Sequence, residues 1–130
     1  MIGILYNPRV AQARPLAEEM AAWIEQGGRQ VRVCAADDAS DTLCLQETGL
    51  LVTLGGDGSI LRAARAAAPY GTLLLGVNLG RVGFLTEAEP GTWREVLARV
   101  LAGDYWVEER MMLRAVTWRG GRDVGAGRST

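Results

Sequence analysis

Short apolar runs alternate with amphipathic stretches along the first hundred residues of the chain. The apolar runs predict buried strands at residues 2–6, 31–34, 50–54 and 72–78. Between them, apolar positions recur at helical spacing and predict helices at residues 12–25, 59–68 and 92–102. Strands that alternate with helices favour an α/β fold with a doubly wound, mostly parallel sheet and helices over its faces.

The pattern changes after residue 104. Residues 105–107 and 113–118 predict strands, and the Arg-Gly-Gly-Arg sequence at 119–122 is typical of a hairpin turn. We therefore divide the chain into an α/β domain at residues 1–104 and the beginning of an incomplete β-rich domain at 105–130. Because two isolated strands are marginal in water, we expect the chain to be a fragment that lacks most of this second domain.

Composition excludes several kinds of chemistry. The chain has 130 residues, 48% of them hydrophobic, which is enough for one domain with a buried core. Its net charge of −1 argues against nucleic-acid or membrane-surface binding. Histidine is absent and all 14 basic residues are arginine, so histidine catalysis, a P-loop lysine and a Schiff base are excluded within this chain. Any chemistry must therefore use carboxylates, arginines, hydroxyls and backbone amides.

The cysteines and the N-terminus indicate a cytoplasmic protein. Cys34 and Cys44 form no CxxC pair and suit reduced thiols. The first residues lack the charged and apolar regions of a signal peptide, and no apolar run approaches the ~20 residues of a membrane span.

The strongest chemical motif lies at the end of the third predicted strand, where Gly55-Gly56-Asp57-Gly58-Ser59 leads into a helix. Open α/β sheets bind ligands at this edge, and a helix N-terminus favours an anion such as phosphate. Glycines allow a sharp turn and close approach of a ligand, and Ser59 is predicted to cap the helix. Asp57 cannot attract phosphate, so it would take a proton or help to hold a metal ion. The alternative is a structural turn with a solvated Asp57.

A second motif follows the next strand and should emerge at the same sheet edge. In it, Asn78 offers a donor and an acceptor, Gly80 and Gly83 permit unusual backbone angles, and Phe84 can pack on a base or ribose. The alternative is a plain strand-to-helix loop with Phe84 in the core.

Together these residues resemble the paired motifs of the NAD kinases. The resemblance covers nearly the whole chain, from Gly3 to about Trp118. The first motif also occurs in lipid kinases and phosphofructokinases, and the second narrows the assignment. The matching positions are Gly55-Gly56-Asp57-Gly58, Asn78-x-Gly80-x-x-Gly83-Phe84-Leu85-Thr86, Gly3-Ile4-x-x-Asn7-Pro8 and Glu109-Arg110-x-x-Leu113.

The resemblance implies a Rossmann-like fold and phosphorylation of NAD at the adenosine ribose 2′-hydroxyl. The donor is ATP or polyphosphate, with a divalent metal, Mg²⁺ by expectation, and the full-length protein is expected to be a homo-oligomer. Asp57 matches the general base. By the same resemblance, the phosphate turn comprises Gly56, Gly58 and Ser59, and the dinucleotide positions include Asn78, Gly80, Phe84 and Leu85. No residue of this chain is assigned as a metal ligand.

One departure from the family pattern concerns a further Asn-Glu or Asn-Asp motif that grips the dinucleotide, which this sequence lacks. We therefore expect residues 1–130 alone to bind NAD weakly and not to turn over. Among weaker candidates, Arg62 and Arg65 can reach phosphates from the helix after the first motif, although a solvent-facing position is an alternative for both. Arg81, inside the second motif, is another candidate, for a contact with phosphate or with a partner chain.

Two further hypotheses stay open from the sequence. A lipid or sphingoid kinase shares the first motif but not the second. A non-catalytic nucleotide-binding module would keep the turn without the reaction, although passive phosphate binding does not need the carboxylate of Asp57.

Overall fold

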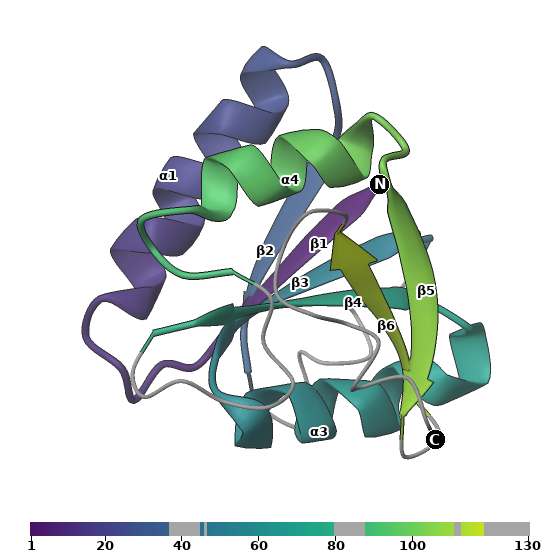
Figure 1. The fold of residues 1–130 in the computed structure, drawn as a ribbon. Coiled ribbons are helices and arrows are strands. Elements are labelled where there is room, and N and C mark those ends of the chain that lie inside the picture. Colours follow the sequence, from purple (N-terminus) through teal and green to yellow (C-terminus); the bar gives the residue numbers. More distant parts are fainter. Residues whose placement is uncertain (37–44, 46, 80–87, 111–112, 119–130) are drawn as a thin grey trace.

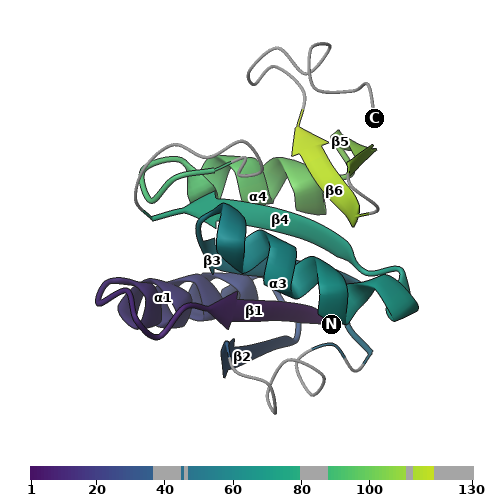
Figure 2. The same cartoon turned by 90° about the horizontal axis from the view of Figure 1, so that it is seen from below.

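A computed structural model describes residues 1–36, 45, 47–79, 88–110 and 113–118. Six strands form one sheet in the order β2-β1-β3-β4-β6-β5. Figure 2 shows this order from one edge of the sheet to the other. The strands are β1 (Ile2–Tyr6), β2 (Val31–Ala35), β3 (Leu50–Gly55), β4 (Leu73–Asn78), β5 (Tyr105–Arg110) and β6 (Leu113–Trp118).

The first four strands run parallel, as the sequence predicts, and form the sheet that positions the site. β1 lies between β2 and β3, with Ile2 in register with both Val31 and Leu50. Continuous apolar runs suit these strands because both faces of a parallel sheet are covered by helices. The predicted mostly parallel α/β fold is confirmed.

Among the described helices, α1 (Ala13–Gln26) and α4 (Trp93–Leu101) lie over one face of the sheet and α3 (Asp57–Ala67) lies over the other (Figure 1). A 3₁₀ turn spans Ala68–Tyr70. α1 ends where Gly28 adopts a positive φ of 85°, a backbone conformation that glycine reaches without strain. Pro69 falls in the 3₁₀ turn that ends α3, because proline cannot continue a helix interior.

The two faces have separate apolar cores. Beneath α1 and α4, buried side chains from both helices meet Ile4, Val52 and Val77 of the sheet. Here the rings of Trp23 and Trp93 pack edge to face, with centroids 5.6 Å apart. The core beneath α3 is smaller; its members are Leu5, Cys34, Leu45, Leu51, Ile60, Ala63, Ala67 and Leu74.

Of the two C-terminal strands, β6 spans the predicted residues and β5 departs from the sequence-based prediction. β5 extends to Arg110 rather than ending at residue 107, and it pairs antiparallel with β6. β6 in turn lies beside β4, where Leu74 is in register with Ala115. Strand pairing thus joins residues 105–110 and 113–118 to the sheet of the first four strands, and their assignment to a second domain remains a prediction. The predicted turn at 119–122 and Cys44 lie outside the described residues.

Candidate functional site

The carboxyl ends of β1 and β3 form the point at which the sheet reverses its winding. From β1 the chain passes through α1 to β2, and from β3 it passes through α3, on the other face, to β4. Open α/β sheets bind ligands in the crevice at such a switch point. Asn7 follows β1 and Gly56 follows β3, so the Gly-Gly-Asp-Gly motif lies at the expected binding edge.

α3 begins directly in this motif. Gly56 is the N-cap residue in an extended conformation (φ −138°, ψ −159°), and Asp57 is the first helical residue. The Gly56 carbonyl accepts the N–H of Ile60 at 3.1 Å. The first backbone amides of a helix have no acceptor within the helix, and the helix dipole adds positive potential there. The start of α3 can therefore hold a phosphate group.

Ser59 does not cap α3, contrary to the prediction from sequence. The helix begins two residues earlier than expected, so Ser59 lies within its first turn. An ideal β-carbon built on Gly55 would lie only 2.1 Å from Ser59 Oγ. Ser59 therefore packs on the end of β3, and this contact requires glycine at position 55.

The other two glycines of the motif have a different explanation. An ideal β-carbon on Gly56 or Gly58 meets no atom within 4 Å. Positive φ angles occur instead at Gly28, Gly71 and Gly103 among the described glycines, so the sharp turn predicted for this motif does not use the left-handed region. Packing within the protein therefore leaves room for a side chain at positions 56 and 58. A ligand that approached the backbone closely would exclude a side chain there and would require glycine.

The second motif begins immediately beside the first. Asn78, the last residue of β4, is in register with Gly55, and the N–H of Leu79 donates to the Gly55 carbonyl at 2.9 Å. Asn78 is 5% exposed. Because side chains alternate along a strand, Asn78 shares the face of Leu74, which packs in the core beneath α3. The predicted meeting of the two motifs at one sheet edge is confirmed for Gly55 and Asn78.

Backbone hydrogen bonds fix the end of β4 from its other side. The N–H of Asn78 donates to the Ala88 carbonyl at 2.7 Å, and the N–H of Ala88 donates to the Gly76 carbonyl at 3.1 Å. The chain therefore leaves the sheet at Leu79 and is again paired with β4 at Ala88. Gly80, Gly83, Phe84 and Leu85 of the second motif, with Arg81, lie between these points and outside the described residues.

The loop after β1 brings two further residues to this edge. Asn7 donates its N–H to the Leu54 carbonyl, and Asn7 Oδ1 accepts the N–H of Arg9, both at 3.0 Å. Gln12 Nε2 donates to the Leu79 carbonyl at 2.6 Å. Sequence reasoning quoted Asn7 only as part of the family pattern and missed Gln12. The local sequence gives one signal for Gln12. It lies at the N-cap of α1, where Ser, Thr, Asp or Asn is preferred, so a glutamine there does not fit local capping.

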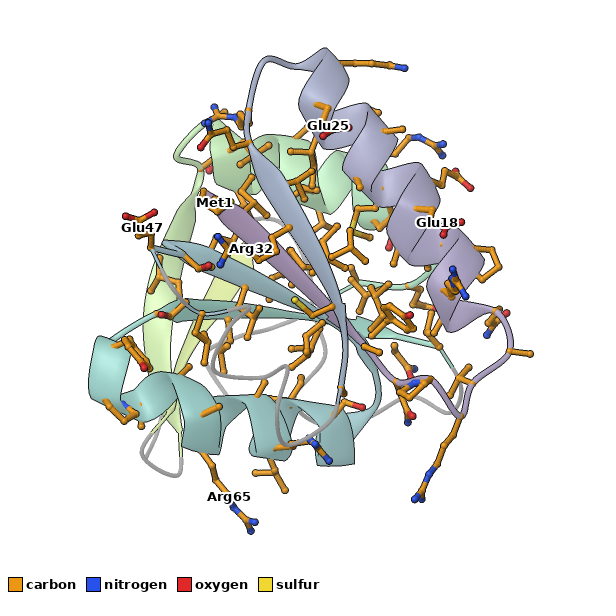
Figure 3. The ribbon with its side chains drawn as sticks, turned by 180° about the vertical axis from the view of Figure 1, so that it is seen from behind. Met1, Glu18, Glu25, Arg32, Glu47 and Arg65 are labelled. Carbon is orange, nitrogen blue, oxygen red and sulfur yellow. The ribbon has the colours of Figure 1, made fainter. Side chains whose placement is uncertain are left out.

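The arginines of α3 lie differently from one another. Arg65 is exposed, and Figure 3 shows its side chain pointing away from the sheet into solvent. Arg62 is half-buried in the helix that starts at the motif. Of the two arginines, Arg62 is therefore nearer to the Gly-Gly-Asp-Gly motif in sequence and less open to solvent.

Neither a metal cluster nor a membrane span is found within the described ranges. No three acidic or cysteine side chains of the described residues gather as metal ligands would. No helix in the same part of the chain has the length and apolar character needed to cross a bilayer.

Comparison with known proteins gives one family. The model of the ATP-NAD kinase N-terminal domain matches residues 35–105. NAD kinase of Heliobacterium modesticaldum is 42% identical over 92% of this chain and 45% of its own length. NAD kinase of Bordetella avium is 44% identical over 78% of this chain and 37% of its own. The chain thus spans less than half the length of these curated relatives.

A solved structure supports the same architecture. Yeast NADH kinase, solved in complex with NADH, superposes with a TM-score of 0.64 over 89% of this chain and 42% of its own. Its sequence identity is 16%, so this match bears on the fold alone.

Proposed function

The chain belongs to the NAD kinase family, and on that premise we propose that the protein containing it transfers a phosphoryl group to the adenosine ribose 2′-hydroxyl of NAD. The observation that carries the proposal is the register of Gly55 with Asn78. It brings the start of α3, the proposed phosphate site, and Asn78, the proposed start of the dinucleotide site, to neighbouring strand ends. ATP, or polyphosphate, is the proposed donor.

We assign binding of the donor phosphates to the start of α3. Backbone amides at Gly56, Gly58 and Ser59 are proposed to hold donor phosphates, with Arg62 adding positive charge. Helix N-termini favour such anions, and phosphoryl transfer depends on positioning and charge stabilisation. The open space before Gly56 and Gly58 supports this assignment, since a ligand can approach the backbone there.

Asp57 is the proposed general base. The 2′-oxygen of NAD forms a bond to the γ-phosphorus of ATP while the bond from that phosphorus to the ADP oxygen breaks. The proton of the 2′-hydroxyl passes to the Asp57 carboxylate, and the products are NADP and ADP. As the first residue of α3, Asp57 lies beside the proposed phosphate site, as a base for this oxygen must.

The dinucleotide end is assigned to the second motif. Asn78 is proposed to hydrogen-bond a polar edge of NAD, and Gly80, Phe84 and Leu85 to surround the dinucleotide. The buried position of Asn78 beside Gly55 supports its part in this assignment.

A divalent metal, by expectation Mg²⁺, fits the site through few protein ligands. Mg²⁺ is commonly held by one or two carboxylates together with substrate phosphates. No three acidic or cysteine side chains of the described residues gather as a ligand cluster, so the substrate phosphates would supply much of the metal's coordination, and no residue of this chain is assigned as its ligand. The metal would neutralise charge on the transferred phosphate.

We further propose a cytoplasmic homo-oligomer that acts on small nucleotides and binds neither nucleic acid nor membranes. The net charge of −1 supports the absence of an electrostatic surface for nucleic acid. Oligomerisation rests on the family resemblance.

The test compares NADP formation by the protein containing this chain with that of its Asp57→Asn variant. Loss of a general base should lower kcat by roughly 10²–10⁴-fold. Asp104→Asn is the matched control, because Asp104 follows α4 and its carboxylate lies 3.5 Å from Arg99 Nη1, in an ion pair away from the motif. Phosphate transfer to a lipid but not to NAD would overturn the proposal, as would full activity of Asp57→Asn.

A further inference from the structure

The side chain of Gln12 makes a tertiary contact from a position where side chains usually act locally. Gln12 is the N-cap residue of α1 and makes no capping hydrogen bond with its side chain. Instead, Gln12 Nε2 donates to the Leu79 carbonyl at 2.6 Å, across 67 residues of sequence. An N-cap side chain normally accepts a bond from the first turn of its own helix. Local helix capping therefore does not explain Gln12.

Leu79 is consequently held through both of its backbone polar groups, which belong to consecutive peptide units. Its N–H donates to the Gly55 carbonyl at the end of β3, and its carbonyl accepts from Gln12. Leu79 is 8% exposed, whereas Gln12 is largely exposed apart from its amide contact. A buried carbonyl that loses its donor carries a desolvation cost, so the bond favours one orientation of the Leu79 carbonyl.

Leu79 adjoins the residue proposed to contact NAD. Asn78 immediately precedes Leu79 and is buried at the end of β4. We propose that Gln12 is a positioning residue for the dinucleotide, acting through the Leu79 carbonyl to fix the end of β4 and the orientation of Asn78. The inference rests on the proposed function, and Gln12 itself touches no reacting atom.

Two variants separate the donated hydrogen bond from simple packing. Gln12→Ala removes the donor, and Gln12→Glu keeps the shape of the side chain but supplies an ionised carboxylate, which cannot donate. The control is Gln26→Ala, which removes an exposed glutamine from the last turn of the same helix. Each is measured for the KM for NAD, kcat and the thermal midpoint in the protein containing this chain.

Both Gln12 variants should raise the KM for NAD roughly three- to tenfold, as expected for one net hydrogen bond, with kcat within about twofold of the wild type. Gln26→Ala should leave the KM unchanged. An active wild-type protein with an unchanged KM in both Gln12 variants would overturn this inference alone. So would a Gln12→Glu variant that matches the wild type, or a lower thermal midpoint without a change in KM. A wild-type protein inactive on NAD would overturn the proposed function and this inference with it.

Discussion

Ser59 occupies the space that a side chain on Gly55 would need. An ideal β-carbon on Gly55 lies 2.1 Å from Ser59 Oγ and 2.8 Å from Ser59 Cβ. Gly55 ends β3 and Ser59 lies in the first turn of α3. The contact therefore sets how closely the helix start approaches the strand end, at the point where the proposed phosphate site lies.

Gly55→Ala should destabilise the fold because the new methyl group displaces the first turn of α3. We expect the free energy of unfolding to fall by about 1–3 kcal/mol, as for other overpacked sites. Urea denaturation measures the change. Gly58→Ala is the matched control, since its methyl group meets no atom within 4 Å. Adding Ser59→Gly to Gly55→Ala should recover part of the loss, and no recovery would show that this contact is not the cause.

Thr53→Val should stabilise the protein. Thr53 is 2% exposed, and its hydroxyl makes no hydrogen bond within the described part of the chain. Valine has nearly the same shape without the buried hydroxyl, so we expect the free energy of unfolding to rise by about 1 kcal/mol. Thermal or urea denaturation measures the gain.

Thr72→Val should lower the stability of the protein, whereas Thr53→Val should raise it. Thr72 is also buried, but its hydroxyl donates to the Thr48 carbonyl at 3.3 Å. Removing that bond should lower the free energy of unfolding by about 1 kcal/mol. Equal changes in the two threonine variants would contradict the assignment of one satisfied and one unsatisfied hydroxyl.

The ion pair between Glu19 of α1 and Arg94 of α4 should contribute little to stability. Both side chains are more than half exposed, and such pairs are worth about 0.2–1 kcal/mol. Arg94 also lies over the Trp93 ring, 4.6 Å from its centroid. Arg94→Ala should therefore cost more than Glu19→Ala, because it removes both contacts.

A double-mutant cycle on Glu19 and Arg94 isolates the ion pair. Its coupling energy should decrease as salt is added, since exposed charges are screened. A coupling well above 1 kcal/mol that is insensitive to salt would contradict this account. Truncation of both residues should leave the KM for NAD unchanged, because they join α1 to α4 on the outside of the molecule.

The sequence by itself determined the elements and the chemistry of their ends. Apolar runs predicted the bounds of β1 to β4, and helical spacing predicted the bounds of α1, α3 and α4, to within about two residues. The reason is that burial of one or both faces of an element imposes a period on its apolar residues, which can be seen in the local sequence. The same local pattern predicted β5 too short, since Glu108, Glu109 and Arg110 interrupt its apolar residues. The structure extends the strand because its ladder with β6 continues through them.

Only the tertiary structure decided which strand ends meet and how each site residue is held. Strand order depends on burial and pairing between residues far apart in sequence, and the local spacing of apolar residues carries no information about it. That order places Asn7 beside Leu54 and Leu79 beside Gly55. The structure also starts α3 at Asp57, so that Ser59 packs rather than caps. The bond from Gln12 to Leu79 exists because the β1–α1 loop and the end of β4 converge at the same sheet edge.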